Sequence, residues 1–160
     1  DHRNRFRADA GGLFPQARLI GEEMILDIGG ALRTWLLTRM RDITGSESKV
    51  IPIYLDKFPA GAAPVCLMLS REPGSGDPDN PYVDNASVRL WARHQGAQDA
   101  LKMISNVDVL LNRAVKIDLD GDVRLLGSMM NAGPERLDSE QNKLVRYYCL
   151  YEMKAIARAV

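Results

Sequence analysis

The stretch VRLWARHQGAQDALKMI, residues 88–104, changes its hydrophobic period partway along. Apolar residues alternate as far as Ala92, which is the pattern of a half-buried strand. From Ala97 they return every three or four positions, which is the pattern of an amphipathic helix. His94 and Gln95 stand between the two patterns. The sequence therefore predicts a strand that runs almost directly into a helix.

The neighbouring segments extend this pair of elements into one domain. Asp27 is placed to cap a helix over 27–43, and Asp120-Gly121 between alternating residues predicts a hairpin over 115–130. Pro52 argues for an edge position of the first strand. The other strands are predicted over 49–58, 64–71, 86–93 and 143–156, and the second helix over 96–114. The predicted fold is α+β, a mainly antiparallel β-sheet flanked by two α-helices, in the order α-β-β-loop-β-α-β-β-β.

Two segments are predicted to be loops, and the start of the chain is unlike the rest. Residues 72–85 carry three prolines and two glycines, so they form either a long loop or a protruding hairpin. The stretch 131–142 is also predicted to be a loop. Residues 1–23 lack periodicity and are expected to be an arm or an ill-ordered tail before a single domain over 24–160. A sharper interpretation is that translation starts at Met24, which an intact mass would test.

Composition and charge exclude several classes of function. The 160 residues are 46% hydrophobic and 26% charged, which is ordinary for a globular protein, and the formal net charge is zero. Nothing global therefore suggests a nucleic-acid or membrane partner. Cys66 and Cys149 lie in apolar runs far apart, so they are predicted to be reduced core thiols rather than zinc ligands or a disulfide framework.

Motifs for catalysis, cofactors or metals find little support. His94 has Asp99 nearby, but no serine or cysteine stands in a nucleophile-elbow context. The DLDGD stretch at 118–122 lacks the glutamate that closes a calcium loop, and REPGSGDP at 71–78 lacks a Walker lysine. The sequence therefore predicts no enzyme, no catalytic residue, no cofactor and no metal site.

Several stretches together carry a resemblance to a known family. They are the helix GGALRTWLLTRM, the segment KVIPIYLDKFPAGAAPVCLMLSR with its proline-bearing turn, the strand-then-helix element whose strand is closed by Trp91, and the final strands joined by an acidic loop. Over about 25–155 this pattern resembles the tail terminator, or tail-completion, proteins of long-tailed bacteriophages. The family's relatives include neck and head-completion proteins of similar size.

The resemblance implies a structural virion protein at the junction of tail and neck, made in the bacterial host cytoplasm. Its members form a homo-oligomeric ring, usually a hexamer, that caps the tail tube and ends its polymerisation. The implied partners are other copies of the chain, the tail tube protein and the head-completion or connector protein. Double-stranded DNA would pass through the ring without specific binding, and no membrane is involved.

Two groups of residues are candidates for these contacts. Aromatic residues and arginine are enriched where proteins meet, so one group is assigned to the contact between subunits: Trp91, Arg93, His94, Tyr147 and Tyr151. The other group lies in the predicted loop and is assigned to docking on the tube or lining the channel: Asp77, Asp79, Tyr82 and Asp84. The alternatives are a neck or head-completion protein, or an unrelated small α+β binding module.

Overall fold

The computed structural model describes residues 17–20, 23–72, 82–137 and 143–157. A six-stranded sheet has the strand order β3-β4-β5-β8-β7-β6. Its strands are β3 (Ile53–Leu55), β4 (Cys66–Glu72), β5 (Val83–His94), β6 (Val115–Asp118), β7 (Val123–Leu137) and β8 (Val145–Ala157). The described helices are α2 (Ile28–Leu37), α3 (Met40–Thr44) and α4 (Ala97–Leu111). A separate two-stranded sheet pairs β1 (Ala17–Ile20) with β2 (Glu23–Leu26).

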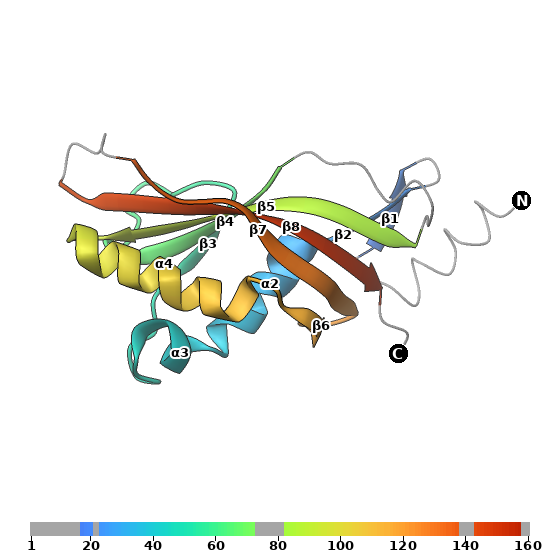
Figure 1. Cartoon of the computed structure of the whole chain (residues 1–160), viewed down its shortest axis with the longest axis horizontal. Helices are drawn as coiled ribbons and strands as arrows, with labels where there is room; N and C mark the ends of the chain where they lie inside the picture. Colours follow the sequence, from blue (N-terminus) through green and yellow to red (C-terminus); the bar gives the residue numbers. More distant parts are fainter. Residues whose placement is uncertain (1–16, 21–22, 73–81, 138–142, 158–160) are drawn as a thin grey trace, which may run out of the picture.

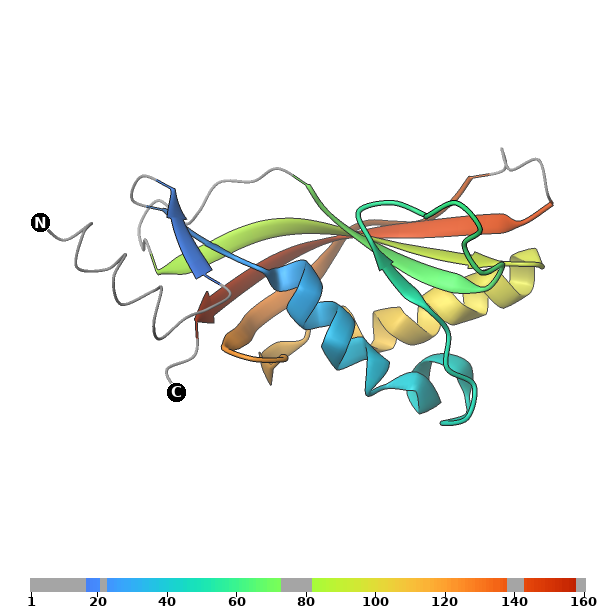
Figure 2. The same cartoon turned by 180° about the vertical axis from the view of Figure 1, so that it is seen from behind.

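The predicted fold class is confirmed. From α2 onward the elements follow the predicted order, except that the first helix is divided in two, and β1 and β2 before it were not predicted. Each neighbouring pair in the six-stranded sheet is antiparallel except β3 and β4, which are parallel. All three described helices lie on the same face of the sheet, as the two opposite views show (Figures 1 and 2). Within the described residues, no helix covers the opposite face, which we call the open face.

The strand-to-helix junction is as predicted, because β5 ends at His94 and α4 begins at Ala97. Val88, Leu90 and Ala92 are buried toward the helices. The residues between them point to the open face, since successive strand residues face opposite sides. The neighbouring strand β8 has its side chains on the same two faces, and those in the core are Cys149, Tyr151, Met153 and Ala155.

The predicted helix over 27–43 is in fact two helices. Asp27 caps α2 as expected, since its side chain accepts a hydrogen bond from the Gly30 N–H at 2.9 Å. The helix stops at Thr38, whose backbone N–H and side-chain hydroxyl both donate to the Trp35 carbonyl. A threonine that bonds its own preceding turn competes with helix continuation. The chain therefore turns there and starts α3 at Met40.

Other predicted boundaries also shift. The predicted loop over 131–142 was wrong as far as Leu137, because β7 continues to that residue and pairs with β8 through several bulges. β5 begins at Val83, so the predicted loop over 72–85 includes the start of a strand. Residues 17–20 form a strand within the predicted arm, whereas 1–16 and 21–22 lie outside the described residues.

The two cysteines are buried thiols that form no disulfide bond, as predicted. Burial raises the pKa of the Cys149 thiol from its ordinary value of 9.0 to about 11. Burial, and then the hydrogen bond to Asp108, also raises the pKa of Tyr151. Both groups therefore hold their protons more tightly in the folded state than in the unfolded chain.

We expect the chain to lose stability between pH 9 and about 11. A raised folded-state pKa contributes stability that is complete below the unfolded pKa and is lost as pH rises through the folded pKa. For Cys149 the loss reaches about 2 kcal/mol by pH 11. Urea unfolding at a series of pH values would measure it, with Cys149→Ala as the comparison. An equally steep decline in this variant would contradict the assignment to Cys149.

Candidate interaction surface

The open face carries alternating arginines and aromatic residues on its two central strands. β5 contributes Arg89, Trp91 and Arg93, which occupy the positions between its buried residues. β8 contributes Arg146 and Tyr148, which are paired directly with Arg93 and Trp91 respectively. This pairing brings the five side chains together. With Phe58 from the β3–β4 loop, they form what we call the arginine–aromatic cluster.

The cluster is built by stacking. The rings of Trp91 and Tyr148 have centroids 5.0 Å apart and are tilted by 44°. The Arg89 guanidinium lies 5.1 Å from the Tyr148 ring centroid, and that of Arg146 lies 5.6 Å from the Trp91 ring centroid. The Arg93 guanidinium lies over Phe58 at 4.7 Å. Such cation–π contacts hold charged groups against ring faces while the guanidinium edges stay able to donate hydrogen bonds.

Polar contacts fix the members of the cluster in place. Arg93 is buried and donates to the carbonyls of Ala62 and Ala63, at 3.2 and 2.6 Å. The Tyr148 hydroxyl donates to Glu135 at 2.5 Å, and this hydrogen bond raises the pKa of Tyr148. Arg89 lies 3.4 Å from a carboxylate oxygen of Glu72. The cluster is therefore an ordered surface that carries three arginines.

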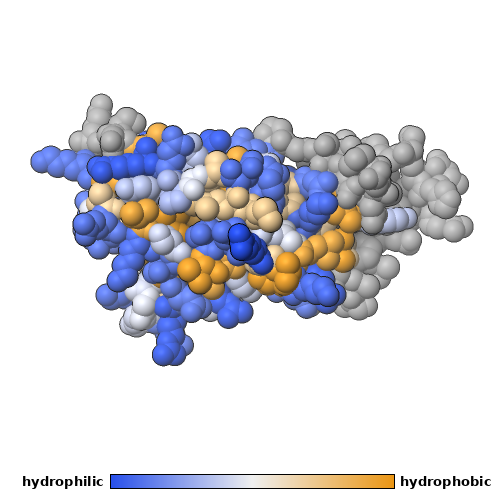
Figure 3. All heavy atoms as spheres, viewed as in Figure 1, coloured by the Kyte–Doolittle hydropathy of each residue, from blue (hydrophilic) through white to orange (hydrophobic). Residues whose placement is uncertain are grey.

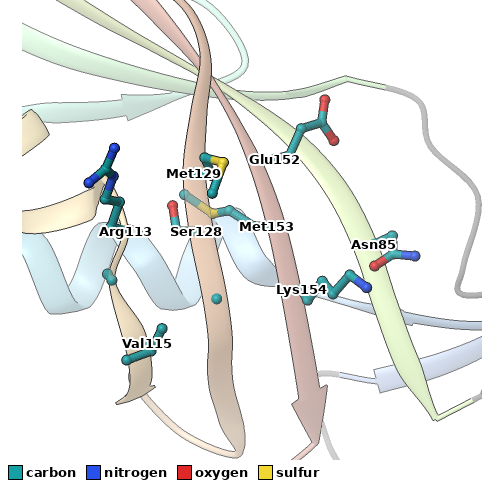
Figure 4. Close-up of a pocket in the computed structure, with 10 residues that line it drawn as sticks. Asn85, Arg113, Val115, Ser128, Met129, Glu152, Met153 and Lys154 are labelled. Atoms are coloured by element: carbon teal, nitrogen blue, oxygen red, sulfur yellow. The ribbon is translucent and has the colours of Figure 1, made fainter.

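A groove of about 580 Å³ lies where β6, β7 and β8 meet, farther along the sheet (Figure 4). Its lining includes Val115 and Met129, which are 66% and 61% exposed. Arg113, Glu152 and Lys154 add charge around these apolar side chains. Figure 3 shows apolar residues exposed as a band over the end of α4 and the strands β6 and β7, with polar residues around it. Exposed apolar groups gathered in a polar rim are typical of a surface that contacts another protein.

The structure separates the residues predicted for the subunit contact. Trp91 and Arg93 belong to the arginine–aromatic cluster. His94 ends β5 on the helix side of the sheet, where it lines a hollow with Asp99 and Lys102 and its Nδ1 accepts from the Gln95 N–H. Tyr147 also lies on the helix side and packs against the core. Tyr151 is fully buried on that face, and its hydroxyl donates to Asp108 at 2.7 Å. An exposed contact position for Tyr151 was therefore wrong.

The residues predicted for the docking loop are also separated. Asp77 and Asp79 lie outside the described residues, and Tyr82 is 53% exposed just before β5. Asp84 was placed wrongly in the loop, because it lies in β5 with its side chain fully buried. It forms an ion pair with Arg71 at 2.7 Å, which explains how a carboxylate is accommodated there.

We expect Tyr151→Phe to lower the free energy of unfolding by about 2 kcal/mol, because it removes a buried hydrogen bond to a carboxylate. Tyr147→Phe is the matched control, because no hydrogen bond of the Tyr147 hydroxyl is seen among the described residues. It should change stability by a few tenths of a kcal/mol. Urea unfolding followed by circular dichroism would measure both, and equal effects of the two variants would contradict this role of Tyr151.

Sequence reasoning missed four members of the cluster. Phe58, Arg89, Arg146 and Tyr148 were not assigned to a site, although the alternation along β5 and β8 placed three of them on defined strand faces. The missing information was which strands are neighbours and in what register they pair. A one-residue shift of register would have sent one strand's side chains to the other face.

Neither a metal centre nor a membrane-spanning helix is found in the part of the chain that the structure describes. No group of three or more histidine, cysteine, aspartate or glutamate side chains is arranged there to hold a metal ion. No described helix is long and apolar enough to cross a membrane. His94 and Asp99 line one hollow with Lys102, and the described residues bring no serine or cysteine to it.

The architecture is a mixed sheet with helices on one face, and the same fold occurs in a solved virus-like particle. A chain of the structure described as "Virion of native gene transfer agent (GTA) particle" superposes with a TM-score of 0.52. The alignment covers 79% of this chain and 94% of that one, at 15% sequence identity. The likeness therefore establishes a shared fold. No family model and no curated protein matches the sequence.

Proposed function

We propose that this chain is a structural virion protein that forms a ring at the end of a tail tube, stops addition of tube subunits and provides the surface for joining the head. The observation that carries the proposal is the fold shared with a chain of the gene transfer agent virion, over nearly the whole of that chain. The resemblance of the sequence pattern to tail terminator proteins supports the specific position.

The surfaces of the chain suit assembly with copies of itself. A ring needs two different patches on each subunit, because its contacts are heterologous. The sheet supplies two separate patches, which are the arginine–aromatic cluster and the apolar groove with the edge strand β6. Among the described residues β6 pairs only with β7, and we propose that its outer edge accepts a strand of another copy. Trp91 and Arg93 are the proposed contacts on the cluster side, and His94 is a proposed contact on the helix side of the same strand.

The charge balance suits passage of DNA through such a ring. The formal charges of the whole chain cancel, and strong phosphate binding needs a marked excess of lysine and arginine. We propose that DNA passes through the ring without specific contacts to bases. The proposed partners remain other copies of the chain, the tail tube protein and the head-completion or connector protein.

The test is an early stop codon in the gene for this chain, in the genome that produces the particles. Electron microscopy would then measure tail length and attachment to heads, with the intact gene supplied separately as the control. Tails of excess and variable length, unattached to filled heads, are the expected result. Tails of normal length that fail to join heads would move the chain to the neck. Intact infectious particles would contradict a virion role.

A further inference from the structure

We propose that the β3 edge of one copy docks against β6, and into the groove beside β6, on the next copy of the ring. The inference rests on the proposed function and deepens it, because it names the strand that the β6 end accepts. The docking segment is 50–56, which contains β3. The receiving groove is lined by residues that include Val115, Gly127 and Met129.

Gly127 indicates that something outside the chain approaches the groove. It lies within β7, and its φ is outside the left-handed region, so its backbone conformation does not require a glycine. A Cβ at this position would have nothing within 4 Å, so the packing of the chain does not require a glycine either. Glycine weakens a strand relative to alanine, and it often marks a place where another backbone comes close. A partner backbone over Gly127 accounts for this residue.

Two polar atoms in the lining of the groove lack a hydrogen-bond partner among the described residues. They are Oδ1 of Asn85 on β5 and Oγ of Ser128 on β7, and both atoms are buried. Figure 4 shows the two side chains on either side of β8. Buried polar atoms nearly always have a partner in native structures. A docking segment that offers N–H donors would supply it.

The outer edge of β3 offers such donors. Hydrogen bonds at the Pro52 carbonyl and the Asp56 N–H direct the backbone groups of these two residues toward β4. Backbone groups of successive residues point to opposite sides of a strand, so those of Ile53 and Leu55 point away from β4. Their carbonyls already accept hydrogen bonds, from a side chain of α2 and from the turn that follows. The two N–H groups remain as outward donors, with no partner seen among the described residues.

The apolar side chains at the two ends of the sheet also match. β3 and β6 are the first and last strands of the sheet order, so a contact between them joins two different patches, as a heterologous ring contact does. Val50 and Leu55 are exposed on the β3 side, and Val115 and Met129 are exposed at the groove. Covering these groups would favour association. Phe58 follows β3 closely, so the docking edge is continuous with the arginine–aromatic cluster.

Charged groups on the two sides are complementary. Arg113 and Lys154 line the groove, and Asp56 is exposed at the end of β3. No ion pair of these three side chains is seen among the described residues. Lys57, next to Asp56, is exposed as well, and Glu152 lies in the same groove lining as the two cations. Each side therefore offers a charge of either sign to the other, which fixes the orientation of the contact.

Filling the space over Gly127 tests the contact. Gly127→Val and Gly127→Leu place side chains where the partner approaches, and the chain's own packing leaves room for them. We expect the wild type to associate, and each variant to associate at least tenfold more weakly with stability equal to or above that of the wild type. Sedimentation velocity on the full chain would measure association, and urea unfolding would measure stability. Gly127→Ala would replace either variant if it does not fold.

Ser105→Val is the matched control, because Ser105 is exposed on α4 and should leave association unchanged. It adds an apolar side chain to the surface, as Gly127→Val does, but away from the groove.

Cysteine cross-linking tests which strand docks. The double variant Leu55→Cys with Val115→Cys carries one new thiol at each end of the sheet, five strand spacings or roughly 24 Å apart. A short bifunctional maleimide cannot join them within one chain, and the native Cys66 and Cys149 are buried. We expect a ladder of covalent oligomers from the double variant, and only single chains from either variant with one new cysteine.

The opposite results would overturn the contact. They are a wild type that does not associate, folded Gly127 variants that associate as the wild type does, or a double cysteine variant that forms no ladder. Gly127 variants that keep self-association but no longer end tails would assign the groove to another virion protein. Any of these results combined with over-long tails in the stop-codon experiment would remove this contact and leave the proposed function in place. The expected contact combined with intact infectious particles would do the reverse.

Discussion

Replacing Asp84 with asparagine is expected to lower the free energy of unfolding by about 3–5 kcal/mol. The two carboxylate oxygens of Asp84 accept from the two terminal nitrogens of Arg71, at 2.7 and 2.8 Å. One of these oxygens also accepts from the Leu26 N–H at 2.9 Å, and Arg71 donates in turn to the Leu26 carbonyl. The amide of asparagine would leave the arginine charge without its counterion in a largely buried place.

Asp118→Asn is the matched control for this variant. Asp118 forms an ion pair with Arg124 at 2.6 Å, but both side chains are more than two-fifths exposed. Water screens such a pair, so the same chemical change should have little effect on stability. Urea unfolding at neutral pH would measure both variants. A loss for Asp84→Asn no greater than that for Asp118→Asn would show that the buried pair does not hold the end of β2 to the sheet.

Gly133→Ala is expected to lower stability by about 3 kcal/mol or more. Gly133 has a φ of +102°, which residues with a Cβ rarely adopt. A Cβ at this position would also lie 2.9 Å from the Cα of Cys149 and closer still to the carbonyl oxygen of Tyr148. Both neighbours are backbone atoms of β8, so relief requires β7 and β8 to separate. Gly133 lies in the β-bulge between Ala132 and Glu135, and this bulge places Glu135 opposite Tyr148 of the cluster.

Gly61→Ala separates the two causes of this effect. Gly61 has a φ of +74°, but nothing lies within 4 Å of its added Cβ. It should therefore show the cost of backbone strain alone, about 1–2 kcal/mol. Thermal unfolding would measure the loss of stability in both variants. Equal losses at the two positions would mean that the close approach of β7 to β8 does not constrain Gly133.

Much of the fold followed from local patterns in the sequence. The alternation over 86–93 correctly predicted that Val88, Leu90 and Ala92 share one face of a strand, and Asp120-Gly121 correctly predicted the hairpin between β6 and β7. These features depend on residues close together in the chain. The break at Thr38 was missed because the apolar spacing continues across it, and only the hydrogen bonds of its hydroxyl and N–H show where the helix ends.

The candidate surface was harder to predict because it depends on contacts between distant residues. Asp84 looked like a loop residue beside prolines, and its burial becomes intelligible only once Arg71 is known to face it. On β8, tyrosines occupy both alternating sets, so the sequence could not decide that Tyr148 faces outward and Tyr151 inward. The register between β5 and β8 settles this point and assembles the arginine–aromatic cluster.

The most direct test of the proposed function is an averaged electron-microscopy map of the head–tail junction in the particles that this gene serves. We expect a closed ring at the head-proximal end of the tail tube, with subunits that fit the six-stranded sheet and its one-sided helices. The arginine–aromatic cluster of each subunit should face its neighbour. A map in which this fold fits only the capsid or the tube wall, or is absent from the particle, would contradict the proposal.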